Sequence, residues 1–403
     1  MNKPLNVSAK IKYLFISAFI AASISCIEEF NPEINSYSDL LVVDASLIKG
    51  DNVQTVVLRR SNSLNSDEWP MVPDCEVWIS DDANNTFYFT ETAPGEYKAL
   101  IWDRLLTYEN SYALHIETKD GKSYESLPVR ILPGAPVDSI YYVFESNQTS
   151  SSQYEEGLQF YVDLKASDEE AINYRWEVEE TYEYRSFSQI WGMYYPYIDS
   201  VVFYSEPKDS LYYCWKTDKI PGLFSSSLSN LSALQKKKIA LNYVPAGSHK
   251  LNYGYALQVK QYALNDEAYE YWDMLKNQVS ESGGLYQSQP RQSISNITNI
   301  NNQEEAVLGY FWASSVTEKR LFYKNTEYQI VYDYSCAPDT FMVAGVRNPN
   351  LIFFEPIPWF FYLDLIYVSG SYQVWGISNE YCFDCRYDGG ETEKPDYWEE
   401  YFE

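Results

Sequence analysis

Short runs of β-favouring residues follow one another between residues 41 and 127, and turn-forming residues separate them. Such runs, rich in Val, Ile, Thr and aromatic residues, predict half-buried strands. Asp120-Gly121 is the strongest hairpin signal among them. Strands at this spacing predict an immunoglobulin-like β-sandwich over residues 39–132. The predicted strands are 41–43, 55–58, 75–79, 86–89, 97–101, 112–116 and 122–127.

A second β-rich unit is predicted for residues 137–403. Leu132-Pro133-Gly134-Ala135-Pro136 interrupts regular structure and gives the boundary between the two units. One helix is predicted near 266–281, because Asn265 can cap it and Ser282-Gly283-Gly284 ends it. The fold class is therefore mainly β, with a sandwich followed by a larger β-rich domain that carries at least one helix.

A long aromatic insertion is predicted between Ser186 and Tyr213. Long loops inside compact domains are often functional, and Tyr and Trp suit recognition surfaces. Aromatic side chains are also common in cores, so each residue can have either role. The candidate binding surface consists of Trp191, Tyr194, Tyr195 and Tyr197.

The first residues predict an exported lipoprotein. Lysines precede an apolar run over 13–24 that is too short to span a bilayer, which is typical of a signal peptide, here residues 1–25. Cys26 then becomes the candidate lipidation site, and 26–38 a lipidated tether. Glu28 and Glu29 form a candidate export signal. An ordinary cleaved signal with an incidental cysteine is the alternative interpretation.

Charge argues against nucleic acid as a partner. The chain has 30 basic and 57 acidic residues and a net charge of -27. Nucleic-acid binding depends on Lys and Arg that neutralise phosphates. Removal of the signal peptide takes away three lysines and no acids, which makes the mature chain more acidic still.

The cysteines allow several arrangements. Cys75 alternates with apolar residues and is interpreted as a buried free thiol. Export to an oxidising compartment favours disulfides among the remaining four, with a connectivity that the sequence does not decide. A redox or zinc role for Cys382-Phe383-Asp384-Cys385 is the alternative. The candidate disulfide cysteines are Cys214, Cys336, Cys382 and Cys385.

Signals of catalysis are sparse. The chain has only 2 His, and neither His115 nor His249 lies in a metal-binding or nucleophile motif. Carboxylate pairs are too numerous to single out, so a glycosidase remains an open alternative. We expect a protein that is not an enzyme and has no cofactor.

Several short motifs follow one another along the chain. They are Leu41-Val42-Val43-Asp44, Pro94-Gly95-Glu96-Tyr97, Tyr124-Glu125-Ser126, Cys214-Trp215-Lys216-Thr217, Val259-Lys260-Gln261-Tyr262, Tyr271-Trp272, Gln289-Pro290, Val307-Leu308-Gly309-Tyr310-Phe311, and Cys382-Phe383-Asp384-Cys385 with Gly389-Gly390, Pro395 and Trp398. Their order resembles the Bacteroidota outer-membrane lipoproteins grouped as domain of unknown function 4249. The sequence departs from the family pattern at Cys75, where the family more often has a small residue, and at Gln292-Ser293-Ile294-Ser295-Asn296, where Gly usually precedes Asn.

This resemblance implies a partner and no mechanism. It implies a surface lipoprotein, anchored by lipid in the outer membrane, that is often encoded beside a TonB-dependent receptor. The first hypothesis is therefore a non-enzymatic accessory to such a receptor in nutrient capture. A structural or assembly subunit of an envelope complex is the second hypothesis, and a surface hydrolase the third.

Overall fold

The structure, a computed structural model, is mainly β, as the sequence predicts. It describes residues 40–62, 69–148, 154–167, 170–195, 200–281, 295–325, 339–341, 361–368, 372–378 and 382–402. The predicted lipidation site and export signal, Cys26, Glu28 and Glu29, lie outside these residues. Among the described residues, no helix has both the length and the apolar character needed to cross a membrane.

The first unit is built from short antiparallel strands that closely follow the predicted ones. β4 pairs with β5 on one side and with β3 on the other, so it links two groups of strands around one core. Alternate residues of β1 are buried, including Leu41, Val43 and Leu47. The strands are β1 (Leu41–Lys49), β2 (Val53–Arg60), β3 (Glu76–Asp81), β4 (Thr86–Ala93), β5 (Glu96–Leu100), β6 (Ser111–Glu117), β7 (Ser123–Ser126) and β8 (Val129–Arg130), with a 3-10 turn, η1 (Asp103–Leu105).

A segment from late in the chain completes this first unit. β18 (Ile297–Asn299) pairs with β7. The first half of β19 (Val307–Lys324) pairs in parallel with β1, from Leu41 opposite Val307 to Lys49 opposite Ser315. Ile297, Val307 and Phe311 belong to the same apolar cluster as the first strands. The predicted sandwich of residues 39–132 is thus incomplete without strands that come from the predicted second domain.

Gly309 permits the close approach of β1 and β19. Its φ is +97°, and a Cβ atom built there would lie 1.9 Å from the carbonyl oxygen of Val43. Asn296 supports the same region, because its side chain donates to the Phe311 carbonyl at 2.7 Å and accepts from the Phe311 amide at 2.9 Å. The parallel pairing that closes the first unit therefore depends on two local features of the later segment.

The second unit is a sandwich of two sheets. One sheet has the order β16-β10-β9, and the other contains β14, β11, β17 and the second half of β19, with β15 beside β11. Phe160, Trp176 and Tyr255 are fully buried between them. The strands are β9 (Ser139–Gln148), β10 (Tyr154–Lys165), β11 (Asn173–Arg185), β14 (Tyr213–Lys219), β15 (Phe224–Ser227), β16 (Gln235–Pro245) and β17 (Gly254–Leu264).

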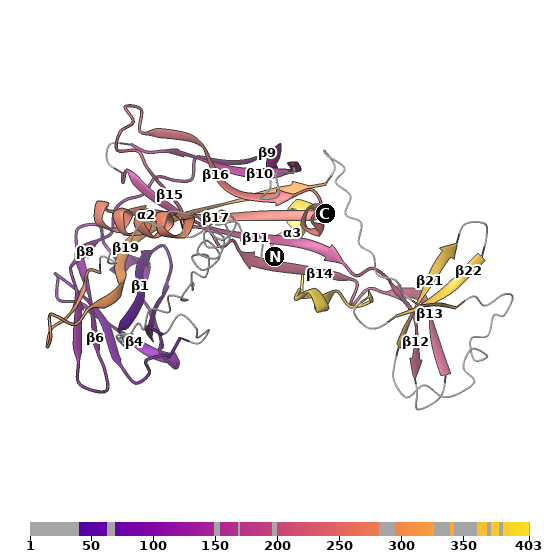
Figure 1. The fold of residues 1–403 in the computed structure, drawn as a ribbon, viewed down its shortest axis with the longest axis horizontal. Helices are drawn as coiled ribbons and strands as arrows, with labels where there is room; N and C mark the ends of the chain where they lie inside the picture. Colours follow the sequence, from indigo (N-terminus) through magenta and orange to yellow (C-terminus); the bar gives the residue numbers. More distant parts are fainter. Residues whose placement is uncertain are drawn as a thin grey trace, which may run out of the picture.

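The predicted helix is present as α2 (Asp266–Glu281) and lies against the outer face of the large sheet (Figure 1). Asn265 caps it, because its side-chain oxygen accepts from the amide of Ala268 at 2.9 Å. Beneath the helix, the guanidinium of Arg175 lies 3.9 Å from the ring centre of Trp272. This cation-aromatic contact helps to fix the helix on the sheet.

A smaller sheet contains the predicted aromatic insertion and lies at one end of the molecule (Figure 1). The insertion forms a hairpin of two strands that extend away from β11 and β14, so its prediction as a loop is wrong. β-favouring Ile, Val, Tyr and Phe residues in both arms explain the strand structure. The sheet has the order β13-β12-β21-β22-β20 and consists of β12 (Ile190–Tyr195), β13 (Ser200–Lys208), β20 (Asp339–Phe341), β21 (Phe361–Val368) and β22 (Tyr372–Ser378).

The last described residues, 382–402, return to the second unit and lie along β14. Trp215 on β14 and Glu391 exchange two backbone hydrogen bonds, each of 2.8 Å. The segment contains a 3-10 turn, η5 (Cys385–Asp388), and a short helix, α3 (Trp398–Phe402). We call residues 382–402 the C-terminal segment below.

Candidate functional site

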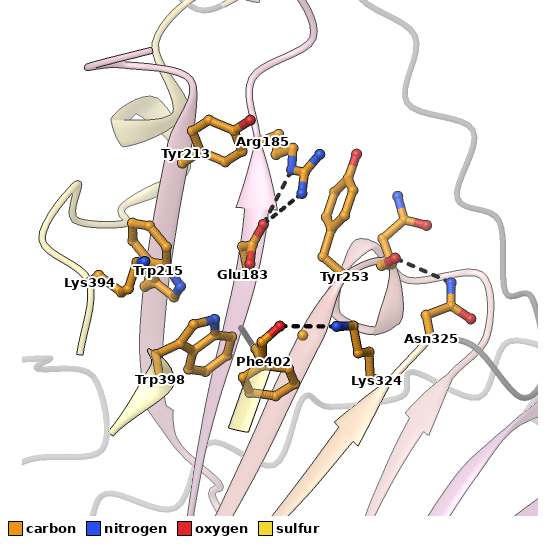
Figure 2. Close-up of a pocket in the computed structure, with 12 residues that line it drawn as sticks. Glu183, Arg185, Tyr213, Trp215, Tyr253, Lys324, Asn325, Lys394, Trp398 and Phe402 are labelled. Atoms are coloured by element: carbon orange, nitrogen blue, oxygen red, sulfur yellow. Dashed lines mark hydrogen bonds and ion pairs between the residues drawn. The ribbon is translucent and has the colours of Figure 1, made fainter. Parts of the chain in front are cut away.

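The candidate site is a pocket of about 510 Å³ on the outer face of the large sheet, where the C-terminal segment meets β11, β14, β17 and β19 (Figure 2). A volume between about 300 and 1,000 Å³ is typical of small-molecule sites. Segments that lie far apart in the sequence therefore form it together. Its lining residues are Glu183, Arg185, Tyr213, Trp215, Asn252, Tyr253, Gly254, Lys324, Asn325, Lys394, Trp398 and Phe402.

Aromatic rings form much of the pocket wall. Trp398 and Phe402 of α3 stack with their ring centres 4.4 Å apart. Gly254, at the start of β17, makes room for them, because a Cβ atom there would lie 2.7 Å from Trp398 and 3.0 Å from Phe402. Trp215 packs in the same apolar cluster as Trp398. The short helix therefore presents its aromatic side chains to the pocket through a close approach that only glycine permits.

Arg185 occupies the upper part of the pocket and is held on three sides. Its guanidinium lies 3.8 Å from the ring centre of Tyr253 and 4.8 Å from that of Tyr213. It also forms an ion pair of 3.0 Å with Glu183 (Figure 2). Burial lowers the pKa of Arg185, but the hydrogen bond and charge of Glu183, with smaller contributions from the tyrosines, keep it above its ordinary value. The charge is therefore permanent and already balanced.

Two indole N–H groups of the pocket residues have no hydrogen-bond partner among the described residues. They are the Nε1 atoms of Trp215 and Trp398, and both atoms are buried. The two residues are 9% and 1% exposed, respectively. A buried donor without a partner costs about 1 to 3 kcal/mol. An acceptor atom of a ligand would remove this cost once the side chains that cover the two donors move aside.

The C-terminal segment is fastened to the large sheet at two places. Cys385 forms a disulfide with Cys214 on β14, across a sequence separation of 171 residues. Tyr184 donates a hydrogen bond of 2.7 Å to the carbonyl oxygen of Cys385. Near the end of the segment, Lys324 donates to the carbonyl oxygen of Phe402 at 3.0 Å. The pocket wall is therefore held by covalent and polar contacts as well as by packing.

The disulfide decides one alternative that the sequence leaves open. Cys385 pairs with Cys214 and not with Cys382, so Cys382-Phe383-Asp384-Cys385 is neither a redox pair nor a zinc ligand pair. Cys382 is also disulfide-bonded. Cys336 lies outside the described residues. Cys75 is free, as predicted, although it is half-buried and not fully buried, and burial raises its pKa.

The predicted aromatic surface does not contribute to the pocket. Trp191 is half-buried on β12, in the separate small sheet. Tyr194 and Tyr195 lie on the same strand, but their side chains lie outside the described part, as does all of Tyr197. The pocket residues Trp215 and Trp398 belong to motifs that carry the family resemblance. Their wide separation in the sequence hides the fact that they meet.

Other polar clusters in the described part are less suited to binding. Glu180 is 2% exposed and lies between the sheets of the second unit, where it pairs with Lys250 and accepts from Tyr255 at 2.8 Å. A second hollow of about 480 Å³, beside β15 and α2, is lined mostly by serine, lysine and other polar side chains. No group of three or more His, Cys, Asp or Glu within the described ranges could hold a metal ion.

One known protein family matches most of the chain. The profile of DUF4249, a domain of unknown function, matches residues 27–320, which is most of the sequence. The chain belongs to the DUF4249 family. The matched range includes β11, β14 and β17, which form the floor of the pocket, and ends before the C-terminal segment that closes it.

Comparisons with curated proteins and with solved structures give no further information on function. No curated protein matches the chain. A DUF4785 family protein from Legionella pneumophila has 10% identity and a TM-score of 0.20, over 57% of this chain and 54% of that chain. The match thus spans about half the length of that protein. Its similarity is too low to support an argument about fold or function.

Proposed function

We propose that this DUF4249 protein is a non-enzymatic lipoprotein on the outer face of an outer membrane, where it helps a TonB-dependent receptor to capture a nutrient. Lipid on Cys26 would anchor it, with Glu28 and Glu29 as the export signal. The short leader before Cys26 and the family resemblance support this location. The pocket beneath the C-terminal segment would hold the nutrient.

The pocket is the observation that carries the proposal. It combines aromatic walls with a few fixed polar groups, which is the usual composition of small-molecule sites. Its cationic and aromatic side chains are held in place by ion pairs and stacking, so little ordering is needed when a ligand binds. A pre-formed pocket of this kind suits reversible capture.

Affinity purification from native membranes tests the proposal. Tagged wild-type protein should sediment with the outer membrane and co-purify with a TonB-dependent receptor. The Cys26→Ala variant should be released from the membrane and lose the receptor, while its fold stays intact. A wild-type protein that co-purifies with no receptor, or a Cys26→Ala variant that still sediments fully, would contradict the proposal.

An assembly subunit of an envelope complex is the second candidate, and an exposed apolar patch favours it. Val53 and Leu100 face each other on β2 and β5 at one end of the first unit and are 50% and 63% exposed. Trp102 and Leu105 lie beside them around η1 and are 52% and 43% exposed. Exposed apolar patches often mark protein interfaces. Loss of co-purifying envelope proteins in a Trp102→Ser and Leu105→Ser variant would favour this second function.

A further inference from the structure

The unsatisfied donors of the pocket point to a ligand that carries acceptor oxygens. Trp215 and Trp398 both line the pocket, and the indole N–H of each is buried and has no acceptor among the described residues. The same two rings belong to one apolar cluster and lie on the same side of the pocket (Figure 2). Asn252 and Asn325 also line the pocket, where the side-chain amide of Asn325 donates to the carbonyl oxygen of Asn252 at 3.2 Å. The ligand must therefore offer oxygens next to an apolar surface.

The charges of the pocket favour a neutral ligand. Arg185 is paired with Glu183, and Lys394 lies 3.3 Å from Glu399. Lys324 donates to the carbonyl oxygen of Phe402. A phosphate or a polycarboxylate would have to compete with these contacts for its counter-charge. An uncharged ligand leaves all of them in place.

The sheet edge beside the pocket is covered, which argues against an extended peptide. β14 is the edge strand of the large sheet. An added peptide strand would need its free backbone groups. At Trp215, however, the C-terminal segment already uses both the N–H and the carbonyl, through Glu391. A peptide could not pair with the edge at this point without displacing that segment.

We propose that the pocket is a saccharide-binding site that takes a neutral sugar. A sugar ring has an apolar C–H face, which can lie on an indole or phenol ring, and a rim of hydroxyl oxygens, which can accept from N–H groups. The indole N–H groups of Trp215 and Trp398 would donate to these hydroxyls after a local shift of the side chains that now cover them. Tyr253, whose ring already stacks on Arg185, would form part of the apolar wall. The inference deepens the proposed function, since it names the class of nutrient.

An oligosaccharide array tests this inference. The probe is a printed set of neutral oligosaccharides, uronic-acid oligosaccharides and short peptides, followed by titration calorimetry with the strongest neutral binder. Wild-type protein should bind at least one neutral saccharide. The paired variant Trp215→Phe and Trp398→Phe keeps both apolar rings and removes both donors. Since each hydrogen bond contributes up to about tenfold in affinity, binding should fall about ten- to hundredfold.

Two further variants keep the test independent of folding. Trp78→Phe, in the first unit, is the matched control and should bind as wild type, because Trp78 stacks on His115 far from the pocket. Tyr253→Leu removes one wall of the pocket from a turn at its rim and should also weaken binding. Thermal unfolding of each variant reports on its fold.

The results separate this inference from the proposed function. If wild-type protein binds no neutral saccharide, or if the paired tryptophan variant and Tyr253→Leu both bind as tightly as wild type, the saccharide site is refuted. Preference for peptides or charged saccharides refutes it as well. Receptor co-purification without saccharide binding would leave the receptor partnership standing. Saccharide binding that depends on Trp215 and Trp398, without a receptor, would support the site and contradict the partnership.

Discussion

The disulfide between Cys214 and Cys385 is expected to hold the C-terminal segment against the pocket. The perturbation is the double substitution Cys214→Ala and Cys385→Ala. Both cysteines are buried, at 0% and 2% exposure, so alanine avoids burying a hydroxyl group. The substitution removes a covalent link across 171 residues of chain.

The size of the effect follows from the closed loop. In the chain-entropy model, a link across this separation stabilises the folded state by about 5 kcal/mol at 25 °C, and removal of native disulfides typically costs about 2 to 5 kcal/mol. We expect the free energy of unfolding to fall by about 3 kcal/mol or more. With a urea dependence of about 3 kcal/mol per molar, the midpoint would move by about 1 M.

Urea unfolding and hydrogen exchange measure the two consequences. The variant should unfold at lower urea, and the amides of residues 391–402 should exchange faster than in the wild type, since the segment opens locally more often. Cys75→Ala is the matched control, because Cys75 is the free cysteine among the described residues. Equal midpoints together with equal protection of 391–402 in the double variant and the wild type would show that the disulfide does not hold the segment.

Three further predictions concern single residues. Gly309→Ala should destabilise the protein by more than the roughly 1 to 3 kcal/mol of a strained backbone, because its Cβ would also overlap Val43; a urea midpoint equal to that of the wild type would contradict this. Gly254→Val should displace α3, and hydrogen exchange in 398–402 that stays as slow as before would count against the proposed close packing. Burial lowers the pKa of His249 below the ordinary histidine value of 6.5. The unfolded chain therefore binds a proton near pH 6.5 that the folded chain does not, and stability should fall as pH drops through 6.5. His249→Gln should remove this part of the pH dependence between pH 7 and 5, and an unchanged dependence would show that other groups cause it.

Local pattern predicts the strands of this protein well, because alternation and turn residues act over a few positions. The hairpin at Asp120-Gly121 and the cap at Asn265 are both present, since each depends only on adjacent residues. The boundary between two units predicted at residues 132–136 describes the fold less well. The return of β18 and β19 to the first unit is a long-range pairing, and nothing in the local sequence of residues 297–315 specifies β1 as its partner.

The pocket could not be predicted for the same reason. Trp215 and Trp398 meet only because the C-terminal segment lies along β14, and the sequence does not choose Cys385 over Cys382 as the partner of Cys214. The sequence instead predicts a binding surface at Trp191 and its neighbours, because aromatic residues are dense there. Aromatic density is easy to see in a sequence, whereas convergence of distant rings depends on topology.

We propose that ligand binds where the C-terminal segment meets the large sheet. Fluorine NMR of protein labelled with 5-fluorotryptophan tests it most directly, with the resonances assigned by single Trp→Phe variants. On titration with the strongest neutral saccharide, the resonances of Trp215 and Trp398 should move while that of Trp191 stays in place. Movement of the Trp191 resonance without change at Trp215 and Trp398 would contradict the account.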